Sequence, residues 1–138
     1  MGDGSKISPE LLARLSDRGG LRTYARGELL IREGEPSTEM YILLAGELKA
    51  YAREADGREL VYNLMSPGEF FGELSLDGGP RSASVEATTG AICVVVAQAD
   101  VQAFLGEYPE FATALVMKLI ARVRAATAQA RSLGLDAG

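Results

Sequence analysis

The sequence predicts a single, mainly β domain with flanking α-helices. Between residues 21 and 96, glycine-bearing turn signals recur at intervals of about 7 to 12 residues, with short apolar segments between them. Many short strands at this spacing are typical of a β-sandwich, a barrel or a β-roll. Helical patterns lie on both sides of this region, and the whole chain of 138 residues has the length of one domain.

A short helix is expected before the strands. Ser8 is suited to be its N-cap, Pro9 stands at the first helical position, and Gly19 follows its end. We therefore assign residues 1–20 to an N-terminal tail and helix.

The β region is assigned to residues 21–97. Its apolar segments are "ELLI", "MYILLAG", "ELKAYARE", "ELVYNLM", "ASVEA" and "AICVVVA". Leu48, Ala50 and Ala52 alternate along one of them, as expected of one face of a strand. The pair Asp56–Gly57 predicts a tight hairpin between two of the strands.

The pattern becomes helical after Ala97, and residues 98–138 are assigned to C-terminal helices. A short helix is expected over 98–106. A long helix is expected over 109–133, because Pro109 suits a helix start and no glycine or proline follows within this range.

Two apolar stripes run along the long helix. The first advances by alternate steps of four and three residues, as in a coiled coil, and consists of Ala112, Val116, Leu119, Val123, Ala126, Ala130 and Leu133. The second stripe, Phe111, Leu115 and Ile120, could pack on the β region. A helix packed only on its own domain is the alternative, but two stripes favour a helix that also pairs with a second copy.

The composition narrows the chemistry. The chain has no histidine, which is the commonest metal ligand and general base, and a net charge of −5 argues against binding nucleic acid unaided. Cys93 alone allows no internal disulfide, structural zinc site or iron–sulfur cluster. We expect no enzyme activity, metal site or cofactor. We also expect a cytoplasmic setting, because no export signal and no membrane-spanning apolar run are visible.

The candidate site lies in "FGELSLDGGPRSASVEA", residues 71–87. Arg81 offers a planar fork of donors that suits a phosphate, and Ser82 adds a hydroxyl group. Residues 73–75 can begin a helical turn whose free N–H groups would form an anion site. These features together predict a phosphate-binding site.

Glu73 calls for a further ligand group, because a carboxylate repels an anion. A ribose hydroxyl is the natural neutral donor for it, and a cyclic nucleotide places a phosphate beside such a hydroxyl. The alternative is that Glu73 and Arg81 form an ion pair that closes a loop. The spacing of the two residues does not decide between these interpretations.

This stretch resembles the phosphate-binding cassette of cyclic nucleotide-binding domains. The family pattern is roughly F-G-E-[LI]-[AS]-L, a variable turn, and P-R-[STA]-A-[ST]-V, and residues 70–85 match every defining position. The segment "ARGELLIREGEPSTEMYILLAGELKAY" is similar to the family's first strands. The resemblance covers nearly the whole chain and implies an antiparallel, jelly-roll-like β-roll flanked by helices.

The resemblance also implies roles for single residues. Gly72 and Glu73 would contact the ribose, Arg81 the cyclic phosphate, and Ser82 the phosphate or the base, with the long helix capping the base. Thr127 could contact the purine of its own or of a partner's ligand, or it could be an exposed helix threonine. The candidate ligand-binding residues are Phe71, Gly72, Glu73, Leu74, Ser75, Arg81, Ser82, Ala83 and Thr127.

The segment "ARSLGLD" resembles the end of the dimerisation helix in CRP/FNR-family transcription regulators, where a winged helix-turn-helix follows. No such element is visible before Gly138, so DNA would be bound only through a domain absent from this sequence. Three functions remain open: the effector domain of such a regulator, a module acting on a channel, kinase or other effector, and a degenerate dimerisation domain. The intact Glu73–Arg81–Ser82 set argues against the third.

The nucleotide is not determined by the sequence. In the family, threonine after the arginine often accompanies a guanine base and alanine an adenine base, and Ser82 lies between them. We expect cyclic AMP, with cyclic GMP possible. We further expect a homodimer through the 109–133 helix and no contact with membranes.

Overall fold

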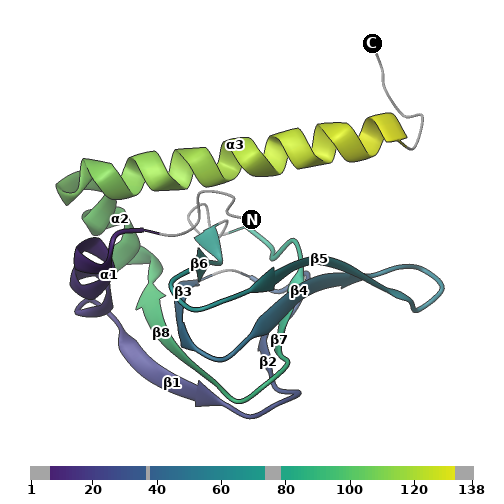
Figure 1. Cartoon of the computed structure of the whole chain (residues 1–138), viewed down its shortest axis with the longest axis horizontal. Helices are drawn as coiled ribbons and strands as arrows, with labels where there is room; N and C mark the ends of the chain where they lie inside the picture. Colours follow the sequence, from purple (N-terminus) through teal and green to yellow (C-terminus); the bar gives the residue numbers. More distant parts are fainter. Residues whose placement is uncertain (1–6, 37, 74–78, 133–138) are drawn as a thin grey trace.

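The computed structural model describes residues 7–36, 38–73 and 79–132. Its elements follow the order expected from the sequence, with a helix first, strands next and two helices last (Figure 1). They are α1 (Pro9–Ser16), β1 (Gly20–Tyr24), β2 (Leu29–Ile31), β3 (Glu39–Ala45), β4 (Leu48–Arg53), β5 (Glu59–Met65), β6 (Phe70–Phe71), β7 (Ser84–Ala87), β8 (Ala91–Ala97), α2 (Gln98–Glu107) and α3 (Pro109–Ser132).

The strands form two four-stranded antiparallel sheets, in the orders β1-β8-β3-β6 and β2-β7-β4-β5. Side chains such as Leu43, Leu48 and Val85 fill the core between the sheets. On the other face of the first sheet, Ile42 and Val96 pack against side chains of all three helices. This arrangement confirms the predicted β-roll with flanking helices, and α3 starts beside α1 and α2 and runs as a rod over the β-roll (Figure 1).

The first helix begins where the sequence predicts. The Ser8 hydroxyl accepts a hydrogen bond from the main-chain N–H of Leu11 over 3.2 Å, as an N-cap does. Leu11 and Leu15 are buried against the first sheet.

The hairpin predicted at Asp56–Gly57 joins β4 to β5, and Gly57 has a φ of +90°. The predicted face of β4 is only partly right, because Leu48 and Tyr51 are the buried residues of this strand. The register with β5 shifts between Ala50 and Tyr51, and Tyr62 is the extra residue on β5 at that point. Such a bulge changes which side chains point to the core, so strict alternation fails here.

The long helix packs on the β-roll through Phe111 and Leu115, as predicted, but the prediction for Ile120 is wrong. Ile120 is 41% exposed, and the buried position beyond Leu115 belongs to Lys118. A helix with 3.6 residues per turn aligns residues three or four positions apart, and Lys118 is three positions from Leu115 whereas Ile120 is five.

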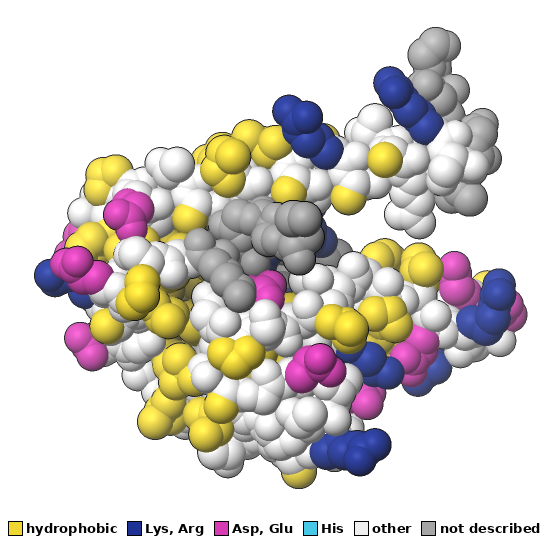
Figure 2. Space-filling view, viewed as in Figure 1, with side chains coloured by type: hydrophobic (Ala, Val, Ile, Leu, Met, Phe, Trp, Pro, Cys, Tyr) yellow, Lys and Arg dark blue, Asp and Glu magenta, His cyan; other side chains and the backbone are white. Residues whose placement is uncertain are grey.

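The other stripe of α3 faces outward only in part. Val116 and Val123 are 53% and 66% exposed, whereas Leu119 packs partly against the helical core. Leu133, the last residue of the predicted stripe, lies outside the described residues. Figure 2 shows apolar side chains along this helix. No helix in the described ranges is long and apolar enough to cross a membrane.

Candidate functional site

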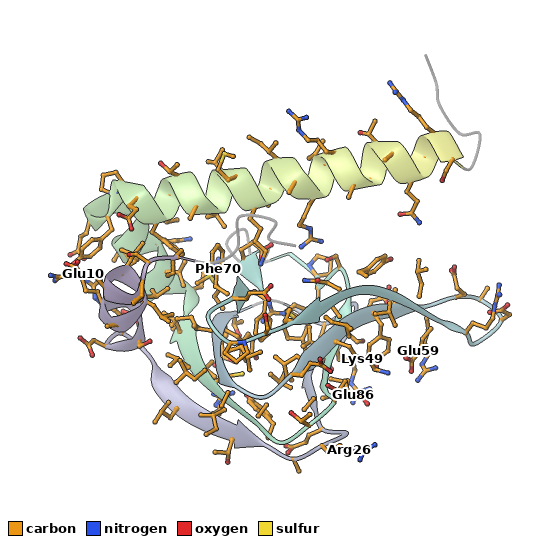
Figure 3. The ribbon with its side chains drawn as sticks, viewed as in Figure 1. Glu10, Arg26, Lys49, Glu59, Phe70 and Glu86 are labelled. Carbon is orange, nitrogen blue, oxygen red and sulfur yellow. The ribbon has the colours of Figure 1, made fainter. Side chains whose placement is uncertain are left out.

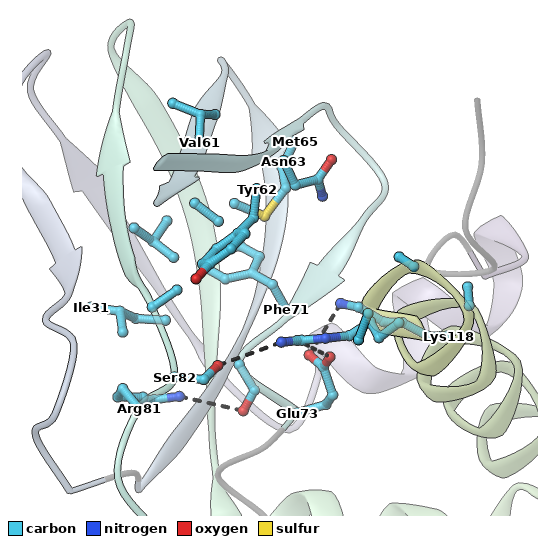
Figure 4. Close-up of a pocket in the computed structure, with 18 of the residues that line it drawn as sticks. Ile31, Val61, Tyr62, Asn63, Met65, Phe71, Glu73, Arg81, Ser82 and Lys118 are labelled. Atoms are coloured by element: carbon cyan, nitrogen blue, oxygen red, sulfur yellow. Dashed lines mark hydrogen bonds and ion pairs between the residues drawn. The ribbon is translucent and has the colours of Figure 1, made fainter. Parts of the chain in front are cut away.

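A pocket of about 610 Å³ lies between α3, β5 and the segments around Gly72 and Ser82 (Figure 4). It opens beneath the C-terminal half of α3, where the surface in Figure 2 is hollowed. Six of the candidate residues line it together: Phe71, Gly72, Glu73, Arg81, Ser82 and Ala83. The chain segment between β6 and β7 therefore brings most of the predicted site to one place.

Arg81 is held in place by main-chain oxygens. Its Nη2 donates to the carbonyl of Glu39 over 2.9 Å. Its Nη1 donates to the carbonyl of Gly72 over 3.4 Å (Figure 4). Burial lowers the pKa of Arg81 from its ordinary value, against the opposing influence of Tyr41 and nearby carboxylates. A guanidinium remains protonated despite such a shift, so Arg81 is a fixed, desolvated positive charge.

A stacked pair of aromatic rings lies beside the Arg81 guanidinium. The rings of Tyr41 and Phe71 are stacked with centroids 5.1 Å apart and an interplanar angle of 9°, and the Arg81 guanidinium lies 5.8 Å from the Tyr41 centroid. Burial, more than the neighbouring Glu39, raises the pKa of Tyr41 to about 12. The hydroxyl therefore stays protonated and donates to the carbonyl of Leu30 over 3.3 Å.

Gly72 allows the backbone to approach Arg81 closely. Its φ is +82°, in the left-handed region that favours glycine. A Cβ atom at this position would stand 3.0 Å from Arg81 Nη1 and 3.2 Å from the carbonyl oxygen of Glu39. The turn that leads into the site thus has both a conformational and a steric reason for glycine.

Glu73 does not form the ion pair with Arg81 that remained open from the sequence. Its side chain is 2% exposed and lies instead against two cations of α3. Glu73 Oε2 is 3.1 Å from Lys118 Nζ, and Oε1 is 3.2 Å from Arg122 Nη1. Among the described residues, no carboxylate lies within ion-pair distance of Arg81.

Arg122 also reaches Ser82, whose hydroxyl lies 3.5 Å from Nη2. Glu73 and Ser82 are therefore connected across the pocket through a single arginine of α3. Its side chain is 46% exposed and lies at the mouth of the pocket.

Three candidates remain: Leu74, Ser75 and Thr127. Leu74 and Ser75 lie outside the described residues. Thr127 is exposed, does not line the pocket of its own chain, and donates to the carbonyl of Val123 over 3.0 Å. A contact between Thr127 and the ligand of its own chain is thus not supported by this geometry, whereas a contact with a partner's ligand stays a prediction.

The pocket residues that sequence reasoning missed include Lys118, Arg122 and Tyr62. Lys118 and Arg122 are far along the chain from Glu73, and Tyr62 stands within an ordinary strand pattern. The only available signal was the break in the second stripe of α3, where lysine stands in line with Phe111 and Leu115.

The charges of the pocket favour an anionic ligand. Three cations, Arg81, Lys118 and Arg122, face a single carboxylate, Glu73, among the described residues that line it. The wall on the β-roll side is largely apolar, with Ile31, Ala50, Leu60 and Val85. A ligand with a phosphate, a hydroxyl group and a flat apolar part matches this distribution.

Comparison with known proteins agrees with this geometry. A family model described as the cyclic nucleotide-binding domain matches residues 21–108. The chain is 32% identical over 119 residues to a CRP-like cAMP-activated global transcriptional regulator of Mycobacterium tuberculosis, which covers 86% of this chain and 53% of the relative. It is 36% identical over 101 residues to a cAMP-dependent protein kinase regulatory subunit of Colletotrichum orbiculare, covering 72% of this chain and 25% of the relative.

Solved structures show the same fold. The crystal structure of the Thermus thermophilus catabolite activator protein has a TM-score of 0.84 and 28% identity, over 93% of this chain and 61% of that chain. The N-terminal domain of a transcriptional regulator from Streptomyces coelicolor has a TM-score of 0.66 and 36% identity, over 87% and 85% of the two chains. The present chain spans about half the length of the first curated relative.

Proposed function

Because the chain belongs to the cyclic nucleotide-binding domain family, we propose that its pocket binds a cyclic nucleotide, with cyclic AMP as the ligand. The observation that carries the proposal is that one pocket holds Arg81, Ser82 and Glu73 in separate positions. Arg81 and Ser82 bind the cyclic phosphate, and Glu73 accepts a hydrogen bond from the ribose 2′-hydroxyl. The carboxylate is free of Arg81, so both groups are available to one ligand.

The base lies between β5 and α3 in this proposal. Tyr62 is 54% exposed, lines the pocket and stands at the bulge of β5, where its ring can stack on a purine (Figure 4). Two curated relatives are named for their response to cyclic AMP, which supports adenine as the base.

The proposed role of the chain is the ligand-sensing part of a CRP/FNR-type transcription regulator. The similarity to the regulator of Mycobacterium tuberculosis over 86% of this chain supports this role. DNA binding would belong to a further domain, since this chain matches about half of that relative. The similarity to the kinase regulatory subunit favours the second candidate, a cyclic nucleotide module that acts on another effector.

We also propose that α3 pairs with the same helix of a second copy. Val116 and Val123 are largely exposed and share one side of the helix. Soluble proteins tend to cover a continuous apolar stripe of this kind, and a two-helix coiled coil does so. In this arrangement Thr127 would approach the ligand of the partner subunit.

Isothermal titration calorimetry tests the ligand directly. The purified chain is titrated with cyclic AMP, cyclic GMP and a cyclic dinucleotide, with linear 5′-AMP as a control for phosphate binding alone. We expect one site per chain, the tightest binding for cyclic AMP and weak binding of 5′-AMP. Absence of binding by all three cyclic ligands would refute the proposed function and favour the degenerate dimerisation domain.

A further inference from the structure

Lys118 is a buried cation at the junction of α3 and the ligand pocket. Its side chain is 7% exposed, and its Nζ lies 3.1 Å from Oε2 of Glu73. The same ammonium group donates to the main-chain oxygen of Phe70 and lies 4.6 Å from the centroid of the Phe70 ring. Figures 3 and 4 show Phe70 under α3 and Lys118 pointing toward Glu73.

Stability alone does not account for a charge at this position. Lys118 continues the row of Phe111 and Leu115, both of which are buried apolar residues. Burying a lysine requires its desolvation, and a well-packed apolar residue at such a place is often at least as stabilising as an ion pair. The contact between Nζ and Oε2 directs attention to what this charge does to Glu73.

We propose that Lys118 is a positioning residue for the ribose subsite, an inference that rests on the proposed function. It holds Oε2 of Glu73 in one place, so that the carboxylate presents its free lone pairs to the ribose 2′-hydroxyl. A carboxylate has about four acceptor positions, of which Lys118 and Arg122 occupy one each, so about two remain for a ligand.

The Phe70 carbonyl makes this positioning rigid. Phe70 belongs to β6, which pairs with β3 in the first sheet, so its main-chain oxygen is a fixed part of the β-roll. An ammonium group bonded to that oxygen cannot follow Glu73 if the carboxylate rotates. The geometry of Glu73 is thus set by the sheet through Lys118.

Arg122 contributes less than Lys118 to holding the Glu73 carboxylate in place. Its side chain is 46% exposed against 7% for Lys118, and water weakens an ion pair at the surface. If Arg122 moves to solvent, the buried Glu73 still pairs with Lys118, whereas the buried Lys118 cannot move to solvent.

The test compares cyclic AMP with its 2′-deoxy analogue in wild type and in Lys118→Met, which keeps a long apolar side chain but removes the charge. Wild type should prefer cyclic AMP by about tenfold to a hundredfold, since the hydroxyl bonds to a charged acceptor. Lys118→Met should bring this preference below about threefold, because it should lose more affinity for cyclic AMP than for the deoxy analogue, which carries the same phosphate. A purely structural role would weaken both ligands equally, and this result would overturn the inference.

A double-mutant cycle with Glu73→Ala tests whether Lys118 affects the ligand preference through Glu73. In the Glu73→Ala background, Lys118→Met should change the preference no further, and a further loss would show that Lys118 acts elsewhere. Arg124→Met, an exposed residue of the same helix, is the control and should keep the full preference.

Failure of the inference is distinct from failure of the proposed function. Wild type that binds neither nucleotide refutes the function, whereas a binding-competent Lys118→Met with the full preference refutes only the role of Lys118. Circular dichroism verifies folding. If Lys118→Met does not fold, Lys118→Gln serves instead, and a full preference in that variant also overturns the inference, because its side chain is neutral.

Discussion

The main-chain carbonyl oxygen of Glu39 lies 2.9 Å from Nη2 of Arg81 and anchors this guanidinium to strand β3. A second oxygen, that of Gly72, accepts from Nη1. Of about five N–H donors in a guanidinium, these bonds use one each, so about three remain for an anion. Arg81 is therefore oriented before a ligand arrives, which reduces the ordering needed on binding.

Replacing Arg81 should remove most of the affinity for cyclic AMP. Loss of one partner from a buried charge pair costs about 2 to 5 kcal/mol, or about 30-fold to several thousand-fold in Kd. Calorimetry on Arg81→Ala measures this loss, and Arg81→Lys should fall between it and wild type, because it keeps the charge but not the fork. Binding of cyclic AMP by Arg81→Ala within about threefold of wild type would exclude Arg81 from the site.

Alanine at Gly72 should reduce both stability and binding. The left-handed backbone disfavours a Cβ by about 1 to 2 kcal/mol, and this Cβ would also meet Arg81 and the carbonyl of Glu39. Gly57→Ala is a matched control, because Gly57 has a φ of +90° but nothing within 4 Å of its Cβ position. Urea unfolding should show a larger loss for Gly72→Ala, and equal losses would contradict a close approach at Gly72.

Removing the ring of Tyr62 should weaken binding through the base alone. Stacking on an aromatic side chain contributes about 1 to 3 kcal/mol per base, so Tyr62→Ala should bind cyclic AMP about 5- to 150-fold more weakly. A cyclic ribose phosphate without a base should bind both proteins equally. Leu64→Ala, at a residue of β5 that is 58% exposed and does not line the pocket, should have little effect. If Tyr62→Ala lost as much affinity for the ligand without a base as for cyclic AMP, the base would not stack on Tyr62.

Introducing charged residues at Val116 and Val123 of α3 should dissociate the proposed dimer. Val116→Lys combined with Val123→Glu changes two exposed residues without touching the core, unlike Leu119, which is partly buried. Light scattering should find monomers for this variant and dimers for wild type. Met117→Lys with Arg124→Glu, at the same spacing on another side of the helix, should remain dimeric. A monomeric wild type at high concentration with ligand present would remove the dimer proposal.

Much of the fold follows from short-range patterns in the sequence. Ser8 and Pro9 set the start of α1 through bonds within one turn, and the glycine-bearing turns with their apolar segments predict the strands. The same holds for the cassette, because Phe71, Gly72, Glu73, Arg81 and Ser82 are close along the chain. These features depend on neighbours a few residues away, so the sequence by itself determined them.

Only the tertiary structure decided which groups meet Glu73. Arg122 lies 49 residues along the chain and reaches the carboxylate because α3 packs across β6. Lys118 rather than Ile120 enters that contact because the helical repeat aligns it with Leu115, and Tyr62 lines the pocket beside a one-residue bulge between β4 and β5. Packing and strand register arise from contacts distant in sequence, so no local pattern could show that Glu73 pairs with α3 and not with Arg81.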